Sequence, residues 1–133
     1  MAESENERLV KDLVEAYNRQ SPSDMVTFLA DDVEVVMQDY RRENKEETEK
    51  SYNWFFSVFP DANMSIDLIM SQVETVVVEL TFTGTHKGEL FGIQPTNRVA
   101  TCPEVWICDV KEGKIISWRE YFNPEPILQQ LRE

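Results

Sequence analysis

The chain has few of the residues that build metal centres and covalent cross-links: its 133 residues include two cysteines and one histidine. Cys102 and Cys108 lie on one expected strand, and at roughly 3.3 Å per residue they are about 20 Å apart, beyond the reach of a disulfide. No CxxC pair or cluster of histidine with cysteine occurs, which argues against a zinc site. We therefore expect two buried or pocket-lining thiols, no metal and no cofactor.

Long apolar runs and an excess of basic residues are also absent. No segment is apolar for long enough to span a bilayer, and the start, MAESENERLV, lacks the basic region and apolar core of a signal peptide. We therefore expect a cytoplasmic protein without a membrane partner. The net charge of −12 argues against nucleic-acid partners, because phosphates repel an acidic surface. No glycine-rich phosphate loop or nucleophile elbow occurs, which argues against nucleotide-binding proteins and serine hydrolases.

What remains is a chain of 41% hydrophobic residues, long enough to bury one core, and we expect a single domain over residues 1–133. Apolar residues repeat with helical spacing in three segments of the first half, 9–17, 25–29 and 52–59. They alternate as in strands in five segments, 33–38, 64–70, 75–86, 98–110 and 114–122. A short helix is expected near residues 127–131, and residues 40–47 are expected to form a solvated polar connection.

This order predicts an α+β fold in which the three helices of the N-terminal half pack on one face of a strongly bent, mainly antiparallel sheet. No other arrangement buries both the helical and the strand stripes. A sheet rolled in this way forms a cone with a mouth at one end, and such a cone usually encloses a pocket.

Three stretches resemble the SnoaL-like polyketide cyclases, which belong to the superfamily of nuclear transport factor two and ketosteroid isomerase. They are FTGTHKGELFGIQPTNR (82–98), VKEGKII (110–116) and FLADDVEV (28–35). The resemblance implies a cone-shaped α+β fold, a homodimer through the outer sheet face, and a deep apolar pocket for a small apolar or aromatic ligand. In polyketide cyclases that pocket closes a polyketide ester by an intramolecular aldol reaction, with an acidic residue of the last strand as acid/base.

A second likeness points to another activity. The segment WREYFN (118–123) is similar to the last strand of limonene epoxide hydrolases, in which the position of Glu120 holds an aspartate that activates water. Those hydrolases also need an arginine and an aspartate two positions apart on the preceding long strand, where this chain has Glu79 and Thr81. Many cyclase-like sequences carry an aspartate at the position of Asn123, and an amide cannot transfer protons.

Glu120 is the main catalytic candidate. If it shares an interior face with Trp118 and Phe122, desolvation raises its pKa toward the range useful for general acid/base catalysis. If the strand presents its other face to the interior, Arg119, Tyr121 and Asn123 line the pocket and Glu120 lies outside. The sequence leaves both orientations open.

The other candidates each have a structural alternative. His86 is either a proton carrier or a residue that holds the neighbouring loop. Trp54, Trp106 and Trp118, together with Tyr17, either stack on a flat ligand or pack the core. Gln38 and Glu104 are polar residues on apolar strand faces and are candidates for the pocket lining.

Three functions follow as hypotheses. The first is carbonyl cyclisation or isomerisation, in which Glu120 moves the proton and His86, Tyr17 or Asn123 polarises the oxygen. The second is epoxide hydrolysis. The third is ligand binding or interaction without turnover.

Overall fold

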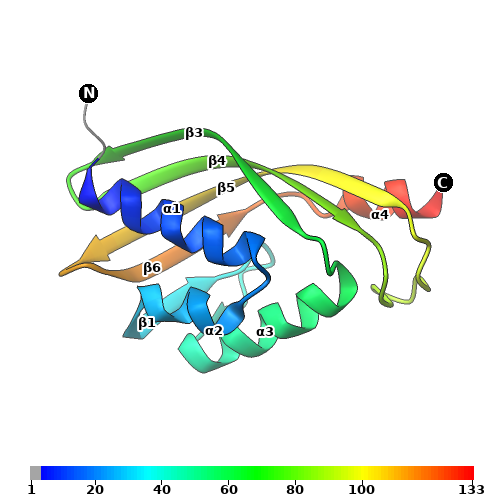
Figure 1. The fold of residues 1–133 in the computed structure, drawn as a ribbon, viewed down its shortest axis with the longest axis horizontal. Coiled ribbons are helices and arrows are strands. Elements are labelled where there is room, and N and C mark those ends of the chain that lie inside the picture. The colour runs from blue at the N-terminus through cyan, green and yellow to red at the C-terminus, as the bar shows by residue number, and fades with distance from the viewer. Residues whose placement is uncertain (1–3) are drawn as a thin grey trace.

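Helices dominate the first half of the chain and strands the second (Figure 1). The computed structural model describes residues 4–133, so residues 1–3 of the expected domain lie outside the description. The elements are α1 (Glu5–Asn18), α2 (Pro22–Met25), the 3-10 helix η1 (Val26–Phe28), β1 (Leu29–Val36), β2 (Arg42–Glu43), α3 (Lys45–Val58), β3 (Asn63–Gln72), β4 (Thr75–Thr85), β5 (Val99–Lys111), β6 (Lys114–Tyr121) and α4 (Glu125–Arg132).

The strands within residues 4–133 form one mixed sheet in the order β2-β1-β6-β5-β4-β3. Every neighbouring pair is antiparallel except β1 and β6, which run parallel. The turn between β5 and β6 has positive φ at both central residues, Glu112 (52°) and Gly113 (76°), as two-residue hairpins of type I′ require. The sheet is curved, and β3, β4 and β5 arch over the helices (Figure 1).

The helices begin where the side chains can cap them. Ser4 Oγ accepts a hydrogen bond from the Glu7 amide at the start of α1, and Asn44 and Glu47 form a reciprocal capping box at the start of α3. Both helices place their apolar residues against the inner face of the sheet. The predicted α+β architecture, with three helices of the N-terminal half on a bent, mainly antiparallel sheet, is confirmed.

The core lies between these helices and the inner face of β4, β5 and β6. Cys102 and Cys108 are buried there as free thiols, which is one of the two environments expected for them. The polar connection predicted at residues 40–47 contains the two-residue strand β2, which was missed because so short a strand has no alternation to detect. No helix within residues 4–133 is both long and apolar enough to cross a membrane.

Candidate active site

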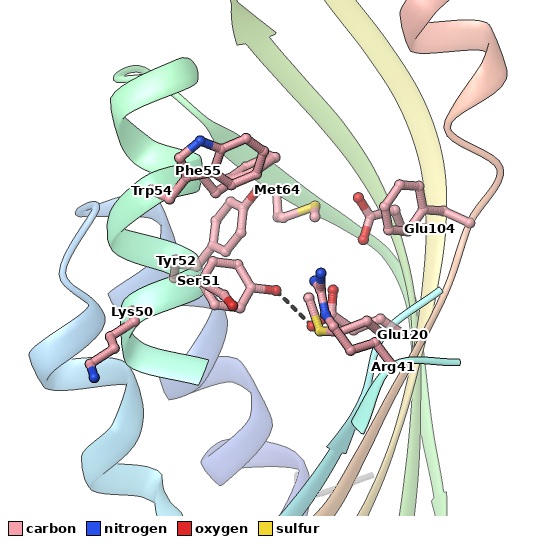
Figure 2. A pocket seen from close by; sticks show the side chains of 12 residues that line it. Arg41, Lys50, Ser51, Tyr52, Trp54, Phe55, Met64, Glu104 and Glu120 are labelled. Atoms are coloured by element: carbon pink, nitrogen blue, oxygen red, sulfur yellow. Dashed lines mark hydrogen bonds between the residues drawn. The ribbon is translucent and has the colours of Figure 1, made fainter. Parts of the chain in front are cut away.

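A cavity of about 440 Å³ opens between α3 and the inner face of the sheet. Two carboxyl groups enter it from the sheet side, Glu104 from β5 and Glu120 from β6, and α3 forms the opposite wall (Figure 2). The apolar and aromatic part of the wall consists of Tyr17, Met37, Tyr52, Trp54, Phe55, Met64 and Phe122. An apolar cavity with a few convergent polar groups is the usual form of a small-molecule site.

Glu120 points into this cavity because the even-numbered residues of β6 face inward from Trp118 onward. Trp118 is fully buried and Glu120 is 4% exposed, whereas Tyr121 is 48% exposed on the outer face. Of the two orientations that the sequence left open, the structure has the one with Glu120 inside. The Tyr52 hydroxyl donates a hydrogen bond of 2.7 Å to Glu120 Oε2, the dashed line in Figure 2.

Burial sets the proton affinity of both carboxyls. It raises the pKa of Glu120 to about 8; the hydrogen bond from Tyr52 opposes this rise, the charge of Glu43 adds to it and the charge of Arg41 opposes it. The pKa of Glu104 is also raised well above its ordinary value, first by burial and then by the nearby Glu120, although the Trp106 indole donates a hydrogen bond of 3.1 Å to Glu104 Oε1. Burial therefore favours the protonated form of both carboxyls.

Tyr52 is held in place by the elements around it. Its ring stacks on Trp118 with the centroids 5.7 Å apart and the planes 5° from parallel, and it meets Tyr17 edge to face at 5.8 Å. Tyr17 lines the same cavity, and its hydroxyl makes no hydrogen bond to another residue of the described chain. A second phenol is thus available to a ligand beside the two carboxyls.

The turn between β1 and β2 adds a cation to the wall. The Met37 amide donates to the Arg41 carbonyl at 2.8 Å, and the Arg41 amide donates to Asp39 Oδ1 at 3.1 Å, so the chain folds back with Met37 and Arg41 side by side in the cavity wall. Arg41 Nε lies 3.4 Å from Glu43 Oε2. Ser51 Oγ donates a short hydrogen bond to that same oxygen.

Four of the predicted site residues line the cavity together: Tyr17, Trp54, Glu104 and Glu120. Trp54 is 49% exposed and therefore belongs to the rim. The roles assigned to these residues stay predictions, but the structure brings them into one place.

Five predicted residues are not among those that line the cavity. Trp106 and Trp118 are fully buried behind the wall, where they position Glu104 and Tyr52. Gln38 accepts a hydrogen bond from the Asp39 amide in the turn before β2. Asn123 is exposed, and its Oδ1 accepts a hydrogen bond from the Glu125 amide at the start of α4.

His86 is fully buried and lies at the base of the loop that follows β4. Its Nδ1 accepts a hydrogen bond of 3.2 Å from the Thr96 amide, and its backbone pairs with Arg98 and Asn97. This arrangement matches the alternative in which His86 holds the neighbouring loop, rather than the one in which it meets a ligand at the mouth.

Sequence reasoning did not assign most of the other lining residues to the site, and Tyr52 and Arg41 are the two of these that act on Glu120. Tyr52 was counted as part of an apolar helical stripe, and Arg41 as part of a solvated charge run. Nothing local in the sequence links Tyr52 to a carboxyl 68 positions away, and only the fold brings Arg41 to the cavity. Within residues 4–133 no group of three or more His, Cys, Asp or Glu side chains is arranged to hold a metal ion.

Comparison with known proteins gives this geometry a context. The sequence model of the family described as SnoaL-like polyketide cyclase matches residues 7–131. None of the curated proteins matches the chain.

Solved structures share the fold over nearly the whole chain. AclR of Streptomyces galilaeus, provisionally described as a hydroxylase, is 25% identical with a TM-score of 0.89, over 96% of this chain and 81% of AclR. IdmH of Streptomyces antibioticus, provisionally described as a polyketide cyclase, is 19% identical with a TM-score of 0.88, over 98% of this chain and 100% of IdmH. A protein with a ketosteroid isomerase-like fold from Catenulispora acidiphila, solved with trimethylamine, is 17% identical with a TM-score of 0.80, over 93% of this chain and 92% of that chain.

Proposed function

Because the chain belongs to the SnoaL-like polyketide cyclase family, we propose that it is an enzyme that performs acid/base chemistry on a carbonyl compound held in the cavity. The reaction class is cyclisation or isomerisation through an enolate. One observation carries this proposal: the buried Glu120 carboxyl faces the cavity with its pKa raised to about 8. A group whose pKa lies near the working pH both accepts and returns a proton efficiently.

The roles in this mechanism follow from the positions of the polar groups. Ionised Glu120 removes a proton from the carbon next to the carbonyl and leaves an enolate. In an isomerisation it returns the proton to another carbon of that enolate; in a cyclisation the enolate carbon bonds to a second carbonyl carbon, and the oxygen of that carbonyl takes the proton. The Tyr17 hydroxyl and protonated Glu104, which both line the cavity, donate hydrogen bonds to the oxygen as it gains negative charge. A carboxylic acid that burial keeps neutral is a suitable donor for this purpose. Proton transfer of this kind needs no metal or cofactor.

The test uses 2-tetralone, an aromatic ketone with acidic protons next to its carbonyl, and follows their exchange for deuterium by NMR. We expect the wild-type protein to catalyse the exchange, and Glu120→Gln to lower the rate by about 10²- to 10⁴-fold, the usual contribution of a general base. The catalysed rate should rise with pH up to about 8, because the ionised carboxylate is the base.

The matched control is Glu112→Gln, since Glu112 is exposed in the turn between β5 and β6; its exchange rate should equal that of the wild type. Exchange that is no faster than in buffer, or that survives Glu120→Gln unchanged, refutes the proposal. In the first case, binding of 2-tetralone without exchange identifies a binding protein without turnover.

Epoxide hydrolysis receives no specific support from the geometry. The residues of β4 that face inward are all apolar or glycine, namely Val76, Val78, Leu80, Phe82 and Gly84. The arginine and acid that the hydrolases place on their long strand therefore have no counterpart on β4.

We further propose that the protein is a homodimer through the outer face of the sheet. Paired residues form an apolar row across that face, Met70–Val77–Ile107, and the next row ends in Leu68 and Tyr121. Met70, Leu68 and Tyr121 are each about half exposed, which favours burial against a second copy. The cytoplasmic location stays a prediction.

A further inference from the structure

Arg41 presents a guanidinium to the cavity from a fixed base. Its Nε is 3.4 Å from Glu43 Oε2, and Glu43 is itself 7% exposed and held by the Ser51 hydroxyl. Beyond this ion pair, the Arg41 side chain makes no hydrogen bond to another residue of the described chain, so the N–H donors of its two terminal nitrogens remain available. Figure 2 shows Arg41 beside Glu120 on the sheet side of the cavity.

Among the ionisable groups of the cavity wall, Arg41 supplies the positive charge that a ligand meets. Burial raises the pKa of Glu120 to about 8 and that of Glu104 well above its ordinary value, so it favours the uncharged, hydrogen-bond-donating form of both carboxyls. Lys50 is paired with Glu46 at 3.4 Å, and its ammonium group points away from the two carboxyls (Figure 2).

An anionic ligand also needs a specific cation here, because the protein as a whole carries a net charge of −12 and repels anions. A guanidinium is suited to this task, since its planar fork of N–H donors matches the two oxygens of a carboxylate. Glu43, which carries the opposite charge, is not among the residues that line the cavity.

We propose that the natural ligand of this cavity carries a carboxylate, which Arg41 binds while the apolar part of the ligand packs against Tyr52, Phe55 and Trp54. The inference rests on the proposed function in one respect, namely that the cavity is the substrate site. It narrows the substrate class from carbonyl compounds to carbonyl compounds that are also acids. A neutral polyketide ester would offer Arg41 no negative charge beyond that of Glu43, so the free acid is the preferred form.

The experiment compares 2-naphthoate with 2-naphthamide, which have the same ring and a planar substituent of similar size but differ in charge. Binding is measured at neutral pH by calorimetry. We expect wild-type protein to bind 2-naphthoate at least about tenfold more tightly, and Arg41→Gln to weaken that binding by about 10- to 100-fold, the usual effect of losing a charged hydrogen-bonded pair. The affinity for 2-naphthamide should change by less than about twofold, because no charge is involved.

Lys50→Gln is the matched control, because it removes the same charge from the rim without touching the proposed contact; both affinities should stay within about twofold of wild type. Arg41→Gln leaves Glu43 unpaired, and if that variant does not fold, the double variant Arg41→Gln/Glu43→Gln replaces it with the same expected result.

Equal wild-type affinity for the two compounds, or an equal loss of both in Arg41→Gln, overturns the inference and leaves the cavity as a ligand site. Absence of binding by either compound overturns the inference together with its premise. The deuterium-exchange experiment with Glu120→Gln tests the acid/base mechanism alone and does not depend on Arg41. A failure of the proposed mechanism is therefore distinguishable from a failure of the carboxylate inference.

Discussion

Replacing Tyr52 with phenylalanine removes the hydrogen bond that its hydroxyl donates to Glu120 at 2.7 Å. That bond stabilises the ionised carboxylate and holds the pKa of Glu120 down against the effect of burial. A hydrogen bond to a charged group contributes about 1.5–3 kcal/mol, and about 1.4 kcal/mol corresponds to one pH unit. We therefore expect the pKa of Glu120 to rise from about 8 by about one to two pH units in Tyr52→Phe.

The assay is a carbon-13 NMR titration of the glutamate carboxyl signals, in which Glu120 is assigned by its disappearance in Glu120→Gln. The phenylalanine ring keeps the stacking on Trp118, so the packing of the site should be preserved. Tyr17→Phe is the control, because Tyr17 is equally buried beside the same cavity but makes no hydrogen bond to Glu120 within the described chain. The reasoning is refuted if the pKa of Glu120 falls or stays constant in Tyr52→Phe. An equal rise in Tyr52→Phe and Tyr17→Phe would attribute the rise to dehydration of the cavity rather than to the lost hydrogen bond.

Two further outcomes follow from the same structure. Folding raises the pKa of Glu120 from 4.5 to about 8. The stability that this shift contributes is therefore present below about pH 4.5 and is lost as the pH rises through about 8. The free energy of unfolding should fall by up to about 5 kcal/mol over that range. Urea unfolding at several pH values should show a flatter dependence in Glu120→Gln, in which the fall due to Glu104 remains, and the same slope in both proteins would contradict the prediction. For the proposed dimer, light scattering should find a dimer in the wild type and a monomer in Met70→Glu. The control Val73→Glu should remain a dimer, because the Val73 side chain is exposed in the turn after β3. A monomeric wild-type protein would refute the proposed dimer.

The sequence predicted the parts of the site that depend on local periodicity. Alternation along the last strand placed Trp118 and Glu120 on the same side, and alternation along β5 placed Glu104 with Trp106. Alternation does not say which of the two faces the helices cover, so the inward direction of Glu120 had to come from the structure.

The residues that the sequence did not predict depend on distant parts of the chain. The stripe of α3 indicates that Tyr52 faces the sheet, but the position of its hydroxyl against Glu120 depends on how α3 crosses β6. Arg41 lies in a charged segment that is typical of a solvated surface, and it reaches the cavity through the turn that begins at Met37. Local sequence patterns carry no information about either contact.

The two acids of the cavity differ in their surroundings, and this difference divides the chemistry between them. Glu120 has Tyr52 and Arg41 to stabilise its ionised form, whereas Glu104 has the single indole donor of Trp106. When Glu120 loses its proton, its new charge raises the pKa of Glu104 further, because like charges on adjacent strands repel. Burial and the charge of Glu120 thus both favour the protonated form of Glu104, which fits the proposed division in which Glu120 is the base and Glu104 the hydrogen-bond donor.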